Sequence, residues 1–139
     1  MWKKTHSIVV KHVSREQIWK LFSDVNNWVN WDTTIEKAHI DGNFEVGNTF
    51  ILQPKWAPEF HIEIIEATPN QSFTDLTRFP LARMYGIHTF EDVDEGMKMT
   101  TTIRIEWILS WIWRKIVAEN IMKNIDADMH HQADIASKL

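Results

Sequence analysis

The alternation of hydrophobic and polar side chains over residues 34–107 is the feature that most limits how this chain can fold. Six segments alternate with a period of two, which is typical of half-buried β-strands. These segments are TIEKAHI, NTFILQP, FHIEIIEA, SFTDLTRF, ARMYGIHTFED and MKMTTTIRIEW. Turn-forming sequences separate them, namely DGNFEVG, PKWAPE, TPNQ, FPL and DVDEG. Because these connections are short, we predict an antiparallel meander of six strands.

The first third of the chain predicts one further strand and two short helices. HSIVVKHV is rich in β-branched residues and alternates, so it predicts a strand. SREQIWKLFSDV predicts a helix, in which Ser14 caps the amino end and Gln17 completes a capping box. WVNWD follows, and we expect it to form a short second turn of helix.

After Trp107 the hydrophobic spacing changes to 3.6 residues, which predicts one helix over roughly residues 110–137. At about 1.5 Å per residue such a helix is ~40 Å long, more than a small sheet needs for cover. We therefore expect residues 1–139 to form a single α+β domain. In it, a strongly curved seven-stranded antiparallel sheet wraps around the long C-terminal helix. A helix laid across a curved sheet leaves space between the two, which predicts a ligand pocket.

Composition and charge exclude several classes of protein. The chain has no cysteine, which excludes disulfides, thiolate metal sites and cysteine nucleophiles. A net charge of -4 argues against a nucleic-acid partner, since such proteins usually carry a basic stripe. No apolar run is long enough for a secretory signal or a membrane span, so we expect a cytoplasmic protein without integral membrane association.

The sequence offers no signature of a cofactor or metal site. It contains no phosphate-binding glycine loop, no G-x-S-x-G elbow and no H-E-x-x-H pair. His130 and His131 are adjacent, so on a helix they point about 100° apart and cannot bind one metal as an i, i+4 pair would. We therefore predict neither a metal nor a cofactor, and we make no prediction of oligomeric state.

Several segments resemble one superfamily of known proteins. VSREQIWKLFSDVNNWVNWD, GNFEVGNTF, GIHTFEDVDEGMKMTTTIRIE and the long final helix are similar to the helix-grip (SRPBCC) superfamily. Its members include START lipid-transfer domains, birch-pollen-type allergens and small bacterial polyketide cyclase/dehydrase-like proteins. The resemblance covers essentially the whole chain and implies the helix-grip fold. It says little about activity, because the superfamily hosts carriers, receptors, cyclases and chaperone activators.

Tryptophan is unusually frequent, with eight residues beside a single tyrosine. In the resembling family, Asp24, Trp28 and Trp31 look like parts of a packing device that pins the short helices to the sheet. We interpret Trp31 as structural, and Trp28 as either core packing or pocket wall, since aromatic walls suit flat apolar ligands. The small bacterial members often carry glycine where this chain has Trp107, so this tryptophan is a departure from their pattern.

His88 is the first candidate for chemistry. Alternation places it on the same strand face as Met84, Gly86 and Phe90, which we expect to be the concave face turned toward the helix. Thr101 is its expected neighbour on the next strand. A buried histidine is well suited to proton transfer near neutral pH. The alternative is a core histidine that is hydrogen-bonded to a hydroxyl or carbonyl group.

Asp75 is the second candidate, because it shares a face with Phe73 and could form an acid/base pair with His88. The alternative is a surface ion pair with Arg78 or Arg83.

Asn120 and Asn124 lie one helical turn apart and could bond a ligand carbonyl or hydroxyl if they faced the pocket. At the helix edge they would only be solvated.

These inferences lead to one predicted site and three hypotheses of function. The predicted ligand-binding residues are Trp28, Phe73, Met84, Phe90, Met99, Thr101, Ile103, Trp113, Val117, Asn120 and Asn124. The first hypothesis is binding of a small hydrophobic or aromatic molecule, such as a lipid, isoprenoid or polyketide-like compound. The second is a polyketide cyclase/dehydratase-type enzyme in which His88, with Asp75, moves a proton. The third is a module that binds a protein or a membrane interface through Trp2, Trp56, Trp107 and Trp111.

Overall fold

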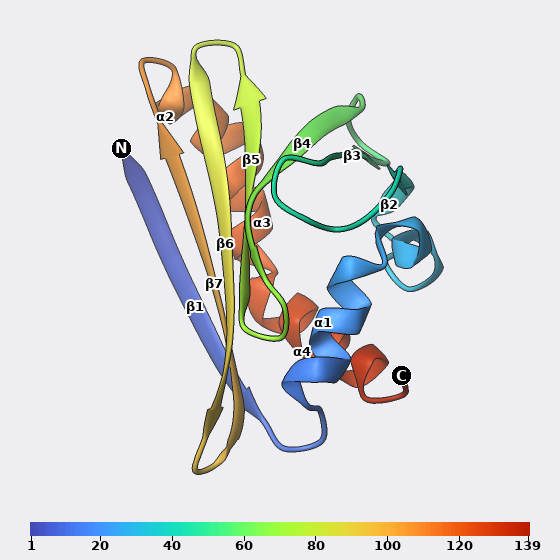
Figure 1. The fold of residues 1–139 in the computed structure, drawn as a ribbon. Helices are drawn as coiled ribbons and strands as arrows, with labels where there is room; N and C mark the ends of the chain where they lie inside the picture. Colours follow the sequence, from blue (N-terminus) through green and yellow to red (C-terminus); the bar gives the residue numbers. More distant parts are fainter.

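The computed structural model describes all of residues 1–139 as one seven-stranded antiparallel sheet with helices on its concave side (Figure 1). The strand order is β1-β7-β6-β5-β4-β3-β2. The strands are β1 (Trp2–Val10), β2 (Ile35–Ile40), β3 (Thr49–Pro54), β4 (Phe60–Thr68), β5 (Ser72–Phe79), β6 (Ala82–Val93) and β7 (Gly96–Glu106). The predicted meander and the seventh strand are therefore confirmed.

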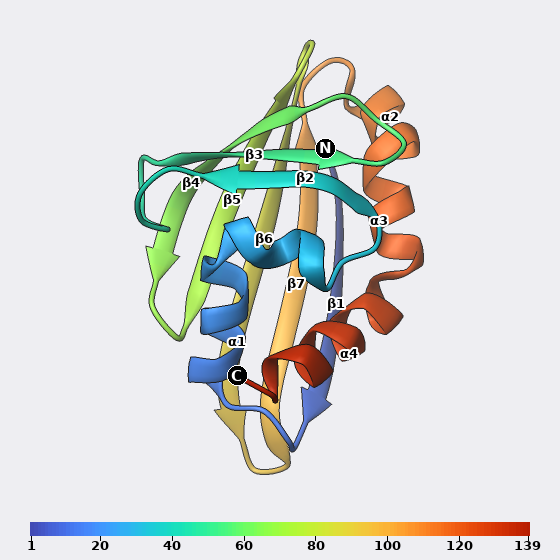
Figure 2. The ribbon, with the colours of Figure 1, turned by 90° about the vertical axis from the view of Figure 1, so that its right-hand side faces the viewer.

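The sheet is strongly curved, and this curvature creates its concave side. Figure 2 shows β2 and β3 running across one end of the long strands β6 and β7. The pairing register shifts between Ile35 and Lys37 and again between Ile64 and Glu66. Such irregularities bend and twist a strand locally, so they help the sheet to fold over on itself.

The helices between the first two strands have the predicted capping chemistry. They are α1 (Arg15–Ser23) and the 3-10 helix η1 (Val25–Asn30). The backbone N–H of Gln17 donates to Ser14 Oγ at 3.1 Å, and the backbone N–H of Ser14 donates to Gln17 Oε1 at 2.9 Å. This capping box satisfies two amide groups that the first helical turn would otherwise leave free.

The C-terminal region is helical as predicted, but the prediction of one uninterrupted helix needs correction. It comprises α2 (Ser110–Trp113), a π-helical turn η2 (Arg114–Ala118), α3 (Glu119–Lys123) and α4 (Ile125–Ala136). The helix breaks at Asn124, whose φ is -111° and ψ is 10°. No glycine or proline marks this break. Its physical reason is packing, because Val117 and Met122 pack in one hydrophobic cluster while Met129 packs in another.

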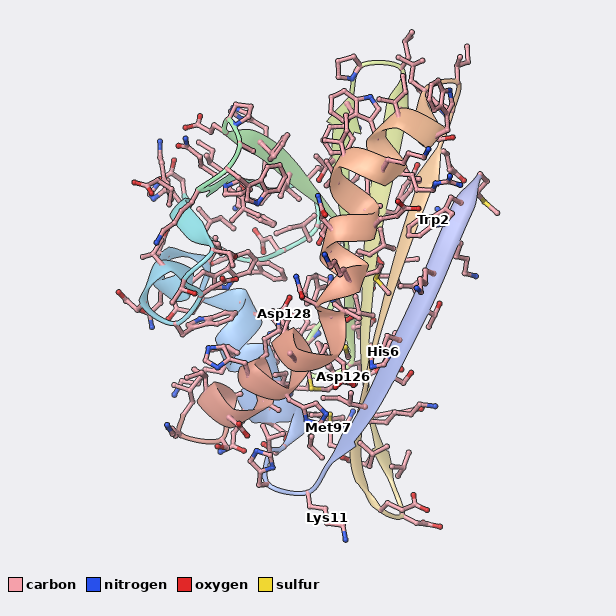
Figure 3. The ribbon with its side chains drawn as sticks, turned by 180° about the vertical axis from the view of Figure 1, so that it is seen from behind. Trp2, His6, Lys11, Met97, Asp126 and Asp128 are labelled. Carbon is pink, nitrogen blue, oxygen red and sulfur yellow. The ribbon has the colours of Figure 1, made fainter.

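The two clusters occupy different parts of the concave side. The larger one joins α1, η1 and α4 to the sheet, and the smaller one lies under η2 and α3. At the back of the molecule, His6 on β1 bonds Asp126 on α4 with Nε2 and Oδ1 2.7 Å apart (Figure 3). His12 and Asp134 form a second such link at 2.7 Å. None of the helices combines the length and hydrophobicity required to span a bilayer.

Candidate functional site

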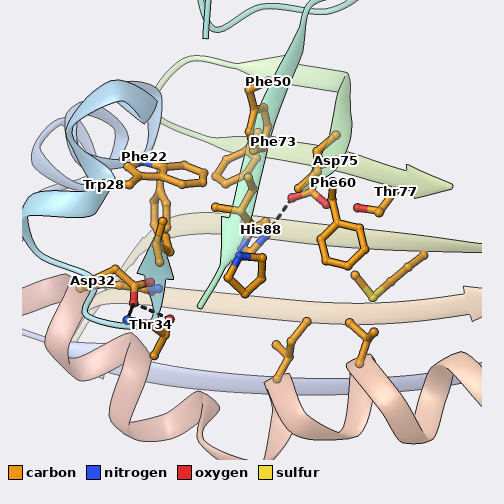
Figure 4. A pocket seen from close by; sticks show the side chains of 18 of the residues that line it. Phe22, Trp28, Asp32, Thr34, Phe50, Phe60, Phe73, Asp75, Thr77 and His88 are labelled. Carbon is orange, nitrogen blue, oxygen red and sulfur yellow. Dashed lines mark hydrogen bonds and ion pairs between the residues drawn. The ribbon is translucent and has the colours of Figure 1, made fainter. Parts of the chain in front are cut away.

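A cavity of about 280 Å³ lies where the curved sheet faces η1 and the C-terminal helices. Of the 21 residues that line it, 14 are hydrophobic. Figure 4 shows the aromatic side chains that surround it together with a few polar groups. The lining residues are Phe22, Trp28, Trp31, Asp32, Thr34, Ile35, Phe50, Leu52, Pro54, Trp56, Phe60, Ile62, Phe73, Asp75, Thr77, Phe79, Met84, His88, Val117, Ile121 and Gln132.

Six of the predicted catalytic and ligand-binding residues line this cavity. They are Trp28, Phe73, Asp75, Met84, His88 and Val117. They come from η1, from the paired strands β5 and β6, and from the helical turn η2. Strand alternation had placed the sheet residues on the concave face, and the buried and exposed positions of β5 and β6 agree with that assignment.

Seven other predicted residues lie outside the cavity wall, and their positions correct the predicted lining. Phe90, Met99 and Ile103 are on the concave face but are buried in the two clusters, where helices cover that part of the sheet. Thr101 is buried beside His88. Trp113 lies behind a lining residue, because its ring stacks on Phe79 with centroids 4.6 Å apart.

Asn120 and Asn124 are exposed and do not face the cavity. The Asn120 amide nitrogen donates back to the Ile116 carbonyl of its own helix at 2.8 Å. Asn124 is the residue at which the helix breaks, between α3 and α4. The prediction assumed one straight helix, and the π-helical turn changes which residues of the later helix point inward. Ile121 and Gln132 line the cavity from α3 and α4 instead.

His88 and Asp75 meet on one wall of the cavity. His88 Nε2 lies 3.6 Å from Asp75 Oδ2, and each side chain is 18% exposed. This is an ion-pair separation beyond ordinary hydrogen-bond length, so both groups keep capacity to bond a ligand. On the other side of the ring, His88 Nδ1 lies 3.3 Å from Thr101 Oγ1, the neighbour expected from alternation.

Packing holds this pair in place. The His88 ring stacks on Phe73 with centroids 4.4 Å apart and planes inclined by 17°. Asp75 is directly opposite Gly86 in the β5–β6 pairing. A Cβ atom on Gly86 would lie 2.7 Å from Asp75 Oδ1, closer than real contacts allow. The absence of a side chain at Gly86 therefore makes room for the carboxylate.

The two tryptophans of η1 and its C-terminal cap have different surroundings. Trp28 is buried, packs edge-on against Phe50 with centroids 5.3 Å apart, and donates from Nε1 to the Leu21 carbonyl at 3.3 Å. It therefore belongs to the core and to the cavity wall together. Trp31 also lines the cavity, and its indole nitrogen is buried without a hydrogen-bond partner. An unpaired buried donor of this kind is costly unless an acceptor forms a hydrogen bond with it.

The remaining lining residues were not predicted to line the cavity, and Trp56 had been assigned to an interaction surface instead. Phe50, Leu52, Phe60 and Ile62 alternate along β3 and β4, so the same pattern that selected His88 could have found them. Asp32, Thr34 and Trp56 lie in connections between elements, where periodicity carries no information about direction. Asp32 Oδ1 accepts from the Thr34 amide at 2.9 Å and from its hydroxyl at 2.6 Å. These two bonds fix the loop that precedes β2 at the cavity.

Asp32 in this loop is close enough to Asp128 on α4 for the two carboxylates to repel each other. Withdrawal from solvent raises the pKa of the Asp128 carboxyl, and the negative charge of Asp32 raises it further, while His131 opposes the shift. A raised carboxyl pKa means that the folded state binds the proton more tightly than the unfolded state. The resulting stabilisation is present at low pH and is lost as the pH rises from the ordinary value of 3.8 through the raised pKa.

Replacing Asp128 with asparagine is therefore expected to stabilise the protein slightly at neutral pH. The gain is on the order of a few tenths of a kcal/mol, because solvent screens a group this exposed. Urea unfolding of the wild type and of the Asp128→Asn variant measures this gain, first at neutral pH and then at a pH below 3.8. The difference should shrink at low pH, and a less stable variant at neutral pH would contradict the electrostatic account.

No group of three or more metal-ligating side chains is present that could hold a metal ion. The cavity lining has two carboxylates, Asp32 and Asp75, and one histidine, His88. It contains no lysine or arginine. The polar groups of the cavity can therefore accept or donate hydrogen bonds and move a proton, and none of them carries a permanent positive charge.

A curved antiparallel sheet closed over a C-terminal helical region, with a cavity between them, defines a helix-grip domain. Residues 1–134 match the family model described as "Polyketide cyclase / dehydrase and lipid transport". The chain belongs to this family, as the resemblance noted in its sequence predicted. No curated protein matches the sequence.

Solved structures share the fold at low sequence identity. Protein NE0264 from Nitrosomonas europaea superposes with a TM-score of 0.73 at 12% identity, covering 98% of this chain and 94% of that one. A norcoclaurine synthase point mutant from Thalictrum flavum, in complex with a transition-state analogue, gives 0.74 at 12% identity, with coverages of 99% and 94%. The di-domain ARO/CYC protein StfQ from the steffimycin biosynthetic pathway gives 0.71 at 10% identity, covering 98% of this chain and 49% of that one.

Proposed function

We propose that this protein binds one small hydrophobic or aromatic molecule in the cavity between its sheet and its C-terminal helices. The observation that carries the proposal is the lining, which is mostly hydrophobic and rich in aromatic rings but contains a few convergent polar groups. This combination is typical of ligand pockets, where apolar walls supply affinity and polar groups fix orientation. Membership of a family that includes lipid transport supports it.

The size and charge of the cavity narrow the chemical class. A volume of about 280 Å³ is just below the ~300–1,000 Å³ that ligand pockets usually occupy. It favours a single isoprenoid or short acyl chain, or a small ring system of the polyketide type, over a lipid with two long chains. Because the lining has two carboxylates and no lysine or arginine, it disfavours a ligand whose anionic group enters the cavity.

The test uses the neutral dye Nile red and a pair of matched variants on the C-terminal helices. Ile121 is partly buried and lines the cavity, whereas Ile116 on the preceding helical turn is 47% exposed and does not. Ile121→Trp should fill the cavity and weaken Nile red binding by roughly tenfold or more, since a pocket this small cannot accept both groups. Ile116→Trp should leave binding unchanged.

A fluorescence titration measures both affinities, and denaturing extraction of gently purified protein followed by mass spectrometry identifies any natural ligand. An apolar compound in stoichiometric amount would support the proposal and name its chemical class. Equal dye binding by the wild type and both variants, with no extracted compound, would reject the cavity as the binding site.

A second candidate function is polyketide cyclisation or dehydration, and the His88–Asp75 pair is the observation that favours it. One of these groups would take a proton from the carbon between two carbonyl groups, and that carbon would then bond to a further carbonyl carbon of the same chain. The other group would protonate the alkoxide oxygen formed there, and in dehydration the resulting hydroxyl would take a proton and leave as water. Their separation of 3.6 Å places both within reach of one bound molecule. Orientation of a flexible chain in the cavity would supply a large part of the rate.

His88→Ala is expected to lower turnover of a poly-β-carbonyl substrate by about 10²–10⁴-fold, the usual contribution of a general acid or base. Nile red affinity should change much less, because the apolar lining remains. His61→Ala is the matched control, since that histidine is exposed on the opposite face of the sheet. Gly86→Ala should also lower turnover by displacing the Asp75 carboxylate. Full activity in His88→Ala would eliminate this candidate.

A further inference from the structure

One end of the molecule exposes four large hydrophobic side chains on two neighbouring turns. Leu81, in the β5–β6 turn, is 58% exposed; Trp107, Ile108 and Trp111, around the start of α2, are 54%, 78% and 58% exposed. The two turns lie at the same end in Figures 1 and 2, and the Leu109 amide donates to the Leu81 carbonyl at 3.0 Å. We call these four residues the Trp107 tip.

The backbone at Trp107 indicates that this side chain is not there for the fold. Its φ is 83°, in the left-handed region that glycine adopts without strain and a tryptophan does not. The indole is kept outside the core, where the Arg83 guanidinium carbon lies 3.9 Å from its ring centroid. Strained positions of this kind are retained mainly where the side chain serves binding or another function.

The charge around the tip is opposite to that of the rest of the protein. Residues 78–83 and 104–119, which form the two turns and their flanks, contain five lysine or arginine residues and two carboxylates. Arg104 and Arg114 pair with those two carboxylates and Arg78 pairs with Glu63, so Arg83 and Lys115 supply the excess positive charge. The remaining residues contain ten cationic side chains and 17 carboxylates. A cationic end on an acidic protein attracts an anionic surface and orients the molecule toward it.

We propose that the Trp107 tip docks on the surface of an anionic lipid bilayer. Tryptophan favours the membrane interface, and apolar side chains surrounded by lysine and arginine are the usual composition of interfacial anchors. A protein partner would need about 800 Å² of contact on each side. Two half-exposed indoles, one isoleucine and one leucine on protruding turns offer much less than that, but they suit shallow insertion between headgroups.

The tip is also close to the cavity. Trp113 donates from Nε1 to the Pro80 carbonyl at 3.0 Å, beside Leu81, and its ring stacks on Phe79. Phe79 in turn lines the cavity. The stacked rings of Trp113 and Phe79 therefore connect the tip to the cavity wall. The docking itself rests on the exposed side chains and their charge, and it does not depend on which molecule the cavity holds.

Co-sedimentation with vesicles tests the proposal. Vesicles of phosphatidylcholine with phosphatidylserine should bind the wild type, and pure phosphatidylcholine vesicles should bind it far less. Trp107→Gly combined with Ile108→Ser should reduce binding by roughly tenfold or more, since two of the four exposed apolar side chains of the tip are shortened. Trp107→Gly relieves the backbone strain, so this variant should keep its fold, which a thermal melt checks.

Lys115→Glu should weaken binding to anionic vesicles, and added salt should do the same.

Val46→Ser is the matched control, because Val46 is 60% exposed on the β2–β3 connection, away from the tip. It should bind vesicles as the wild type does. Absence of wild-type binding to anionic vesicles at low salt would overturn the proposal, as would full binding by the folded Trp107→Gly, Ile108→Ser variant. A wild-type dimer that this variant converts to monomer would assign the tip to self-association and would equally overturn it.

Discussion

Replacing Phe73 with alanine is expected to lower the free energy of unfolding by about 3–5 kcal/mol, the usual cost of removing a large buried aromatic side chain. Phe73 is 2% exposed, belongs to the larger hydrophobic cluster and lines the cavity. Its ring packs against Phe22 and Phe44, with centroids 5.4 Å and 5.2 Å away, and stacks on His88. These neighbours come from α1, the β2–β3 connection and β6, so none can move in to fill the space. Urea unfolding followed by circular dichroism measures the change.

Phe60→Ala is the matched control for this prediction. Phe60 lines the same cavity, but it is only partly buried and packs edge-on against Phe79 alone among aromatic rings, with centroids 5.6 Å apart. Its loss should therefore cost clearly less. If the two variants lose equal stability, Phe73 is not the centre of the core that its contacts indicate. The Phe73 variant should also release His88 from its stacked position, which links the core to the proposed chemistry.

Gly96→Ala is expected to cost roughly 3 kcal/mol or more, because strain and a backbone clash act together. Gly96 begins β7 with a φ of 144°, a conformation that side chains disfavour. An added Cβ would lie 2.4 Å from the Val10 carbonyl oxygen and 3.0 Å from its carbonyl carbon. Both are backbone atoms at the end of β1, so relief requires parting β1 from the β6–β7 hairpin. Chemical denaturation measures the loss.

Gly47→Ala separates the two causes. Gly47 has a φ of 93°, but nothing lies within 4 Å of the position of an added Cβ. This variant should carry only the backbone strain of a left-handed residue, about 1–2 kcal/mol. The difference between the two variants is then the clash with Val10. Equal losses would show that β1 does not pack as closely on the β6–β7 turn as the structure has it.

The proposals for the cavity and for the Trp107 tip are compatible. A protein that collects an apolar molecule from a bilayer, or that returns one, gains from a docking surface beside its ligand site. A cyclising enzyme needs the cavity and the His88–Asp75 pair but has no evident use for exposed tryptophans. Vesicle binding together with an extracted apolar compound would therefore favour the carrier, whereas turnover lost in His88→Ala would favour the enzyme.

Local patterns predicted a large part of this structure. The seven strands, the Ser14–Gln17 capping box and the contact between His88 and Thr101 all follow from the order of side chains along short segments. Alternation also placed Asp75 and His88 on the same concave face, although nothing in the sequence indicated that they would meet. Gly86 explains why they do, because the missing side chain leaves space for the carboxylate.

The sequence by itself determined the strands and the faces of their side chains, since strand alternation follows from local backbone geometry. Only the tertiary structure decided where the cavity lies and which residues bound it. Phe90, Met99 and Ile103 satisfy the same alternation as His88, yet helices cover them, while Asp32 and Trp56 reach the cavity from loops. The break at Asn124 likewise has no local signal. Sheet curvature and helix packing depend on contacts between residues far apart in the chain, and these contacts decide which part of a concave face stays open.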